Sequence, residues 1–135
     1  MITGIGTDLV EVSRIEAMLQ RFPVRALARL FTAAELVRCQ RVTHPARSYA
    51  ARFAAKEAVF KALGTGWGQR VRWTDIEVLT APSGEPSLRL SGGALLLARE
   101  RGADTFHLSL THTEHLAGAY VILEGNGPPK SVAGL

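Results

Sequence analysis

Residues 44–64 read HPARSYAARFAAKEAVFKALG and predict the longest helix of the chain. Pro45 suits the first helical position, where a missing N–H costs nothing, and Gly64 suits the position just after a helix end. Four large side chains recur at helical spacing and share one face of this helix: Tyr49, Phe53, Lys56 and Phe60. Glu57 falls at the edge of this face, so we expect its carboxylate to be partly buried.

The segments before this helix predict a strand and two short helices. Residues 2–10 are rich in β-branched side chains but include Gly4 and Gly6, and glycines inside a strand mark close approach of another backbone or of a ligand. The sequences SRIE (13–16) and TAAE (32–35) both have the capping-box pattern that starts a helix. We expect the first helix to be broken at Pro23 and the second to run to about residue 40.

The segments after the helix predict mostly strands. Strands are expected near 70–80 and 87–90, joined by a turn at 82–84, and a short helix over 94–101 is expected to end at Gly102. The segments 104–111 and 116–124 alternate polar and apolar residues, which indicates a strand pair. The fold class is therefore α+β, with helices packed on an antiparallel sheet in a single domain, residues 1–124. The Gly- and Pro-rich residues 125–135 are expected to be a disordered tail.

The composition excludes several classes of protein. The chain has 135 residues, 47% hydrophobic and 21% charged, which fits one folded domain and not an intrinsically disordered one. Since no apolar run approaches the roughly 20 residues that span a bilayer, we expect no membrane-spanning helix. The N-terminus lacks the basic region of a secretory signal, and Cys39 is the only cysteine. These features favour a cytoplasmic protein without an internal disulfide.

Charge is unevenly distributed along the sequence. Residues 1–72 contain 12 Lys or Arg and 5 Asp or Glu, whereas residues 73–135 contain 4 and 7. The basic half is either a solvated helical surface or a docking surface for an acidic partner, such as a nucleic acid, a membrane surface or an acidic protein. It lacks the aromatic-interleaved and zinc-finger patterns of nucleic-acid-binding proteins, which weakens the nucleic-acid interpretation.

Asp8 and Glu57 are the acidic residues most suggestive of chemistry. Asp8 follows two glycines at the end of the first strand, among apolar neighbours, where a buried charge needs a partner. If the two carboxylates meet, they form a hard-oxygen site for Mg²⁺ that also holds phosphate. The simpler alternatives are that Asp8 caps a turn and that Glu57 pairs with Lys61 at i,i+4. Spacing alone leaves both possibilities open.

Two other features suit anion binding less specifically. The loop GTGWG (64–68) follows a helix, so it matches neither nucleotide-binding fingerprint. Its amides suit an anion with Lys61 beside them, although a helix-stopping turn also explains it. His107 shares a strand face with Ser109 and Thr111, which indicates either a ligand groove or an exposed sheet face.

Three sequence blocks together carry a family resemblance: GIGTDLVEVSRIE (4–16), RFAAKEAVFKALGTG (52–66) and HLSLTHTEHLAGAYVILE (107–124), with GEP (84–86) in the expected hairpin. The chain resembles the holo-acyl carrier protein synthases, the short 4′-phosphopantetheinyl transferases, continuously over about residues 1–124. The resemblance implies transfer of the phosphopantetheine arm of coenzyme A to a serine of an apo acyl carrier protein, with release of adenosine 3′,5′-bisphosphate.

The resemblance also implies roles for individual residues. Asp8 and Glu57 would hold Mg²⁺ against the diphosphate of coenzyme A, and Lys61 would complete the catalytic set. Glu57 and a metal-bound water both remain candidates for accepting the serine proton. The implied coenzyme-binding residues are Arg52, Lys61, Gly64, Thr65, Gly66, Pro86 and His107.

Partners and assembly follow from the same resemblance. The family docks its acidic carrier proteins on the first helix, where this chain has Arg14 and Arg21. Arg25 is a further counterpart, but it lies beyond Pro23, where this sequence departs from a continuous basic helix. Family members are usually homotrimers with active sites between subunits, and the resemblance implies neither a nucleic-acid nor a membrane partner.

Two rival functions remain at this point. A non-enzymatic module binding nucleic acid through the Arg-rich half explains the charge but leaves Asp8 and Glu57 unexplained. A zinc hydrolase would use His107, His112 and His115, although their spacing matches no known zinc motif.

Overall fold

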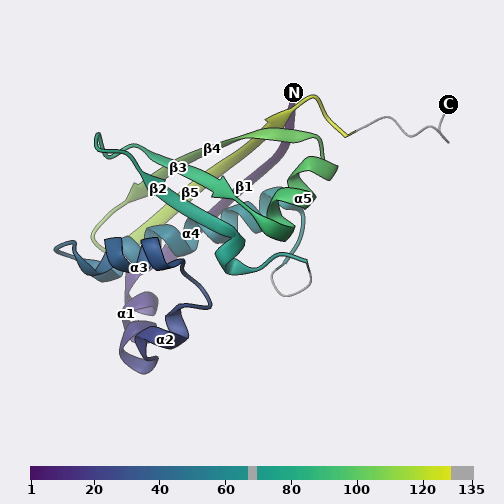
Figure 1. Cartoon of the computed structure of the whole chain (residues 1–135). Coiled ribbons are helices and arrows are strands. Elements are labelled where there is room, and N and C mark those ends of the chain that lie inside the picture. The colour runs from purple at the N-terminus through teal and green to yellow at the C-terminus, as the bar shows by residue number, and fades with distance from the viewer. Residues whose placement is uncertain (67–69, 129–135) are drawn as a thin grey trace, which may run out of the picture.

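The computed structural model describes residues 1–66 and 70–128 (Figure 1). In chain order its elements are β1 (Ile2–Glu11), α1 (Val12–Arg21), α2 (Val24–Leu27), α3 (Ala33–Gln40), α4 (Pro45–Leu63), a 3₁₀ turn η1 (Trp73–Asp75), β2 (Ile76–Thr80), β3 (Pro86–Leu90), α5 (Gly92–Glu100), β4 (Ala103–His112) and β5 (Leu116–Gly125). In the described part of the chain, no helix is long and apolar enough to cross a membrane.

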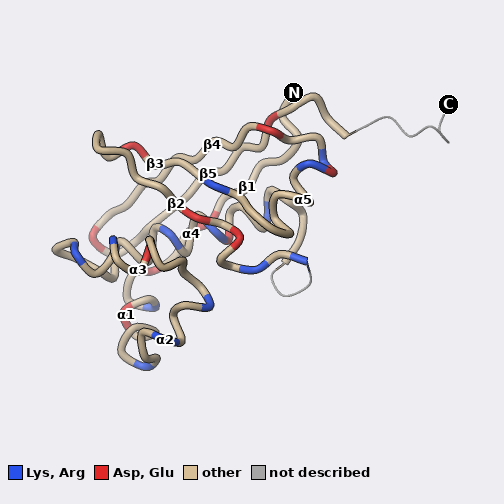
Figure 2. The backbone as a smooth tube through the Cα atoms, in the orientation of Figure 1, with Lys and Arg blue, Asp and Glu red and all other residues tan. Residues whose placement is uncertain are grey.

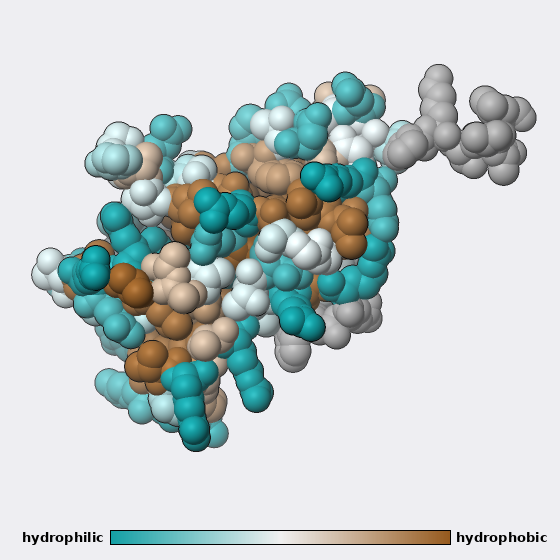
Figure 3. Space-filling view, viewed as in Figure 1, coloured by the Kyte–Doolittle hydropathy of each residue, from teal (hydrophilic) through white to brown (hydrophobic). Residues whose placement is uncertain are grey.

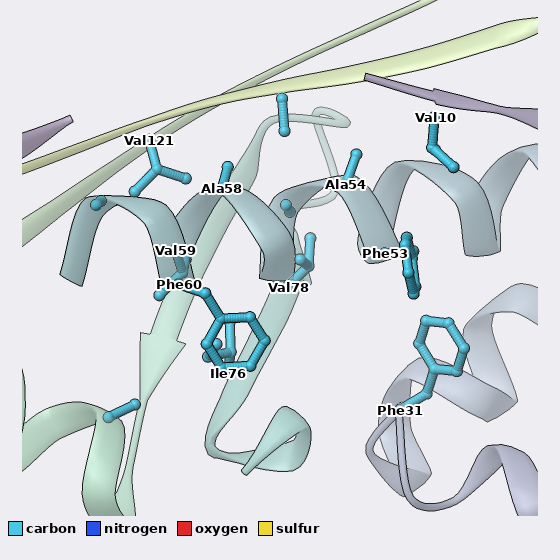
Figure 4. Packing of buried hydrophobic residues seen from close by; sticks show 14 of the residues in the cluster. Val10, Phe31, Phe53, Ala54, Ala58, Val59, Phe60, Ile76, Val78 and Val121 are labelled. Carbon is cyan, nitrogen blue, oxygen red and sulfur yellow. The ribbon is translucent and has the colours of Figure 1, made fainter. Parts of the chain in front are cut away.

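The strands form two antiparallel units, which confirms the α+β class. One is a three-stranded sheet in the order β1-β5-β4, and the other is the β2-β3 hairpin. Helix α4 runs between them (Figure 4): Ala54 and Ala58 point toward the sheet, and Phe60 lies with Ile76 on the hairpin side. The small alanines let the helix lie close to the sheet, whereas the large side chains fill the wider space on its other side.

The two glycines of β1 are explained by this packing. A Cβ added at Gly6 would overlap the carbonyl oxygen of Ala58 and lie 2.8 Å from the amide nitrogen of Ala62, and one added at Gly4 would overlap the Ala62 carbonyl oxygen. The expected close approach is therefore confirmed, and the approaching backbone is that of α4 in the same chain. It follows that Gly4 and Gly6 fix the distance between β1 and α4.

The two predicted capping boxes have different outcomes. The box at Thr32 is confirmed: its Oγ1 accepts from the amide of Glu35 at 3.3 Å, and the Glu35 carboxylate accepts from the amide of Thr32 at 2.9 Å. The box at Ser13 is wrong, because α1 begins at Val12 without a side-chain cap. The amide of Val12 donates instead to the carbonyl of His115 at 2.8 Å, so the β4–β5 turn satisfies this first donor.

Several predicted boundaries also shift. The strand expected from residue 70 begins only at Ile76, because residues 73–75 form η1, where the carboxylate of Asp75 accepts from the amide of Arg72 at 3.0 Å. Helix α5 starts at Gly92, two residues early, and α2 was not predicted. Strand β5 reaches Gly125, one residue into the segment assigned to the tail. Residues 129–135 of that tail lie outside the described residues.

Candidate functional site

The structure brings Asp8 and Glu57 together at the contact between β1 and α4. Gly6 packs directly on Ala58 of α4. Asp8 is two residues further along β1, so it lies on the same face of the sheet as Gly6, the face that packs on α4. The side chain of Asp8 is only 17% exposed. Burial raises the pKa of the Glu57 carboxyl, the negative charge of Asp8 raises it further, and Lys61 and Arg14 oppose the rise. The two carboxylates, called the acidic pair below, therefore lie close enough for the charge of Asp8 to act on Glu57.

Lys61 joins this pair from one turn further along α4. Its ammonium donates to the Asp8 carboxylate at 3.1 Å and to the carbonyl of Thr7 at 2.9 Å. Lys61 therefore binds to β1, and its interactions extend beyond the i,i+4 pair with Glu57 that the sequence offered as the simpler alternative. Its side chain is 54% exposed.

The segment 64–66 lies just beyond Lys61. Gly64 caps α4 with φ of +70°, a conformation that L side chains rarely adopt. The amide of Thr65 donates to the carbonyl of Phe60 at 3.0 Å. A helix-stopping role is therefore established for Gly64, whereas a Cβ at Gly66 would meet nothing within 4 Å. Trp67 and Gly68, the rest of the predicted loop, lie outside the described residues.

Arg52 and Pro86 lie together but apart from the acidic pair. Arg52 is buried and donates to the hydroxyl of Ser48 at 2.8 Å and to that of Thr80 at 3.3 Å. Thr80 is the register partner of Pro86 in the hairpin. The Nε atom of Arg52 has no hydrogen-bond partner among the described residues. Within one chain, these two residues do not join Asp8.

His107 lies on the opposite face of the three-stranded sheet. In the register, His107 pairs with Ile122, which pairs with Ile5 on β1. These residues alternate with the ones that face α4, so His107 and Asp8 point to opposite sides. The imidazole Nε2 of His107 lies 2.9 Å from the Glu124 carboxylate, and the His107 side chain is half exposed. Within one chain, His107 and the acidic pair therefore share no pocket.

The arginines predicted to dock a carrier protein are all exposed. Figure 2 shows basic positions on and around α1 and α2. The guanidinium of Arg14 lies 5.7 Å from the ring centre of Phe53, and that of Arg21 lies 5.5 Å from the ring centre of Phe22. Arg25 lies on the separate helix α2, so the predicted break at Pro23 is confirmed. Figure 3 shows hydrophobic and hydrophilic side chains interspersed over α1, α2 and α3.

Comparison with known proteins shows the family. Residues 4–122 match the model of the 4′-phosphopantetheinyl transferase superfamily. The chain belongs to this superfamily. A holo-[acyl-carrier-protein] synthase of Methylorubrum extorquens is 52% identical over 128 residues, covering 92% of this chain and 94% of the relative. The one from Syntrophus aciditrophicus is 46% identical over 125 residues, covering 93% and 98%.

Solved structures of phosphopantetheinyl transferases agree. The holo-[acyl-carrier-protein] synthase of Neisseria meningitidis superimposes with a TM-score of 0.83 at 33% identity, covering 92% of this chain and 99% of that one. The Bacillus anthracis synthase, solved in complex with coenzyme A (3′,5′-ADP), gives 0.77 at 37% identity, covering 93% and 99%. Family membership supports the transferase and neither of the rival functions, the nucleic-acid module and the zinc hydrolase.

One buried ion pair of this transferase was missed by sequence reasoning. Lys56 and Glu35 are both fully buried, and their charged groups lie 2.8 Å apart. The Lys56 ammonium also donates to the carbonyls of Trp73 and Ile76, and the Glu35 carboxylate accepts from the amide of Val78 at 3.0 Å. The pair joins α3, α4 and β2, and Lys56 is the residue that precedes Glu57 in the sequence. A lysine among large apolar side chains on one helix face was the available signal.

Proposed function

We propose that this chain transfers the 4′-phosphopantetheine group of coenzyme A to a serine of an apo acyl carrier protein, at a centre built from Asp8, Glu57 and Lys61. The ion pair of Asp8 with Lys61, with the Glu57 carboxylate near enough to feel the charge of both, is the observation that carries the residue assignment. Phosphoryl transfer depends on positioning and charge neutralisation more than on covalent chemistry by the protein. A partly buried site with two carboxylates and one accessible ammonium suits both demands.

The donor set fits Mg²⁺. Asp8 and Glu57 supply carboxylate oxygens, and Mg²⁺ is typically bound through one or two carboxylates plus substrate phosphates. Burial is the main cause of the raised pKa of Glu57, and repulsion from Asp8 adds to it. A cation bound by the two carboxylates would relieve that repulsion. When bound there, Mg²⁺ would neutralise charge on the diphosphate of coenzyme A.

The chain's own residues account for orientation of the phosphate. Lys61 donates to Asp8 in the structure and has further protons to offer a phosphate oxygen. A carboxylate that binds Mg²⁺ is a weaker base than a free one. Glu57 and a metal-bound water therefore both stand as candidates for the group that takes the serine proton.

The position of α1 supports carrier docking beside this centre. Arg14 is close enough to Glu57 for its charge to act against the burial-driven rise in the pKa of that carboxyl. A carrier protein whose acidic side chains meet Arg14, Arg21 and Arg25 would therefore present its serine near the acidic pair. In this proposal the docking surface formed by Arg14, Arg21 and Arg25 therefore lies beside Asp8 and Glu57.

A homotrimer with sites between subunits explains the residues that one chain leaves apart. The sheet face that carries His107 also exposes Ile5 (62%), Leu9 (66%) and Tyr120 (59%), and exposed apolar patches mark interfaces. Covering this face with a second copy would place His107 against a neighbouring subunit. Light scattering should then give about three times the 14.6 kDa chain mass, whereas Leu9→Asp should yield smaller species.

A cytoplasmic location and a role in fatty-acid synthesis complete the proposal, since apo carrier proteins and coenzyme A are its substrates. The test incubates the protein with coenzyme A, Mg²⁺ and an apo carrier protein and measures the mass of the carrier. Asp8→Asn and Glu57→Gln keep side-chain shape but remove a charge, and each should reduce transfer at least 100-fold, the scale on which electrostatic groups act in catalysis. Full activity in either folded variant would contradict the site assignment.

A further inference from the structure

Lys56 uses all three protons of its ammonium inside the protein. It contacts the carboxylate of Glu35, 2.8 Å away on α3, and donates to the carbonyls of Trp73 in η1 and Ile76 at the start of β2. Glu35 in turn accepts from the amide of Val78 on β2 at 3.0 Å. One side chain of α4 is therefore held by groups on three other elements, through hydrogen bonds that depend on angle as well as distance.

These contacts continue to the β2–β3 hairpin. The hydroxyl of Thr32, which caps α3 together with Glu35, donates to the Glu77 carboxylate on β2 at 2.5 Å. Glu77 also accepts from Arg89 on β3 at 3.2 Å. The pair of Lys56 and Glu35 is thus the buried end of a network that joins α4 to the start of α3 and to both strands of the hairpin.

Stability alone does not explain this buried pair. Both side chains are fully buried, and the ring centre of Phe31 lies 5.7 Å from the Lys56 ammonium. Removing two charges from water is costly, and apolar side chains of similar volume are often equally or more stabilising in such a place. Apolar contacts lack direction, whereas a hydrogen bond weakens steeply as its angle departs from straight. The pair therefore restrains the orientation of α4 better than apolar packing would.

The contact of α4 with β1 leaves one movement of the helix unrestrained. Gly6 packs on Ala58, and Figure 4 shows Ala54 and Ala58 facing the sheet. These small groups set how close the helix comes, but they offer no projection that would stop it from turning about its axis. A side chain reaches about 5–6 Å from a helix axis, so a turn of about 10° would move the Glu57 carboxylate by about 1 Å.

We propose that Lys56 and Glu35 are positioning residues, which fix the rotation of α4 and so place Glu57 opposite Asp8. This inference rests on the proposed function, in which Asp8 and Glu57 form the reacting centre. Lys56 directly precedes Glu57 in the helix, so an anchor at Lys56 acts on Glu57 with almost no intervening chain. The pair acts through the helix backbone and contacts neither substrate nor metal.

Lys56→Met and the double variant Lys56→Met with Glu35→Leu separate positioning from stability. The single variant leaves the Glu35 carboxylate buried without its cation, whereas the double variant leaves neither charge, so its melting temperature should be the higher of the two. Transfer to an apo carrier protein, measured well below both melting temperatures, should still be about 100-fold below wild type in both variants, because neither keeps the hydrogen bonds that fix the helix. Recovery of transfer together with the melting temperature would overturn the inference, since a purely stabilising pair predicts it.

Glu35→Gln and an exposed ion pair provide the controls. Glu35→Gln keeps a carbonyl oxygen for Lys56 but removes the charge, so it should lose stability and still transfer at least about tenfold faster than Lys56→Met, which loses the full cost of misplacement. Equal rates in these two variants would overturn the positioning role. Arg70 and Glu100 form an exposed pair with hydrogen bonds of 2.6 and 3.0 Å, and Arg70→Met with Glu100→Leu should leave transfer unchanged.

Crystal structures of the wild type and the double variant test the inference without a transfer assay. We expect α4 of the double variant to be turned relative to β1, with the Glu57 carboxylate displaced by about 1 Å or more. An unchanged position of Glu57 relative to Asp8 would overturn the inference, whatever the activity. Failure of the wild type to modify any carrier protein would instead contradict the proposed function, and the measured rotation of the helix would still decide the role of the pair.

Discussion

Replacing Gly6 by alanine tests how the fold positions the acidic pair. The new methyl group would overlap the carbonyl oxygen of Ala58 and lie 2.8 Å from the amide nitrogen of Ala62. Both groups belong to the backbone of α4, so neither can rotate away. The helix must therefore move outward from β1, and overpacking of this kind destabilises a domain by about 1–3 kcal/mol. For a chain of this size we expect the melting temperature to fall by about 3–12 °C.

The same displacement should reduce catalysis in the protein that remains folded. Glu57 is adjacent to Ala58, and Asp8 is two residues from Gly6, so a helix shift changes the separation of the carboxylates. A misplacement of about 1 Å in an active site reduces rates by about 100-fold. The assay is transfer to an apo carrier protein, followed by mass spectrometry at a temperature below the melting transition, with folding checked by circular dichroism.

Two other glycines provide matched controls. Gly4→Ala meets the Ala62 carbonyl, so it should destabilise the protein similarly but reduce activity less, because it lies further from Asp8. Gly66→Ala meets nothing within 4 Å and should leave the melting temperature unchanged. Wild-type stability and wild-type activity in Gly6→Ala would refute the reasoning that this glycine sets the β1–α4 distance.

The remaining predictions concern the buried pair, the docking surface and the cysteine. Lys56→Met leaves the carboxylate of Glu35 buried without its cation and should lower the free energy of unfolding by about 3–5 kcal/mol. Adding Glu35→Leu should recover part of that loss in a denaturant titration, and a double variant no more stable than the single one would count against a simple charge imbalance. Arg14→Glu combined with Arg21→Glu should weaken carrier binding at low salt, with little effect on coenzyme binding and a smaller difference at 1 M salt, where the Debye length is about 3 Å; unchanged carrier affinity would reassign these arginines to a solvated surface. Burial raises the pKa of the Cys39 thiol, so the native protein should resist a maleimide at neutral pH and react once unfolded, whereas rapid labelling of the native protein would show that this thiol is accessible.

The elements that the sequence predicted correctly are those with short-range causes. The bounds of α4 follow from Pro45 and Gly64, whose conformational preferences act within one turn of the chain. The box at Thr32 needs only a partner three residues away. The alternation of β4 and β5 likewise follows from the pleat of each strand and the half-buried surface of a sheet. Local patterns therefore determined the fold class and most element boundaries.

The tertiary structure decided what depends on distant segments. The start of α1 was mispredicted because the amide of Val12 is satisfied by the carbonyl of His115, a partner that local sequence cannot reveal. Sequence patterns singled out Asp8 and Glu57, but only the packing of β1 on α4 brings the two charges close enough to couple. Spacing along a chain limits what neighbouring residues can do, whereas a binding site is made by side chains that meet only when separate elements pack together.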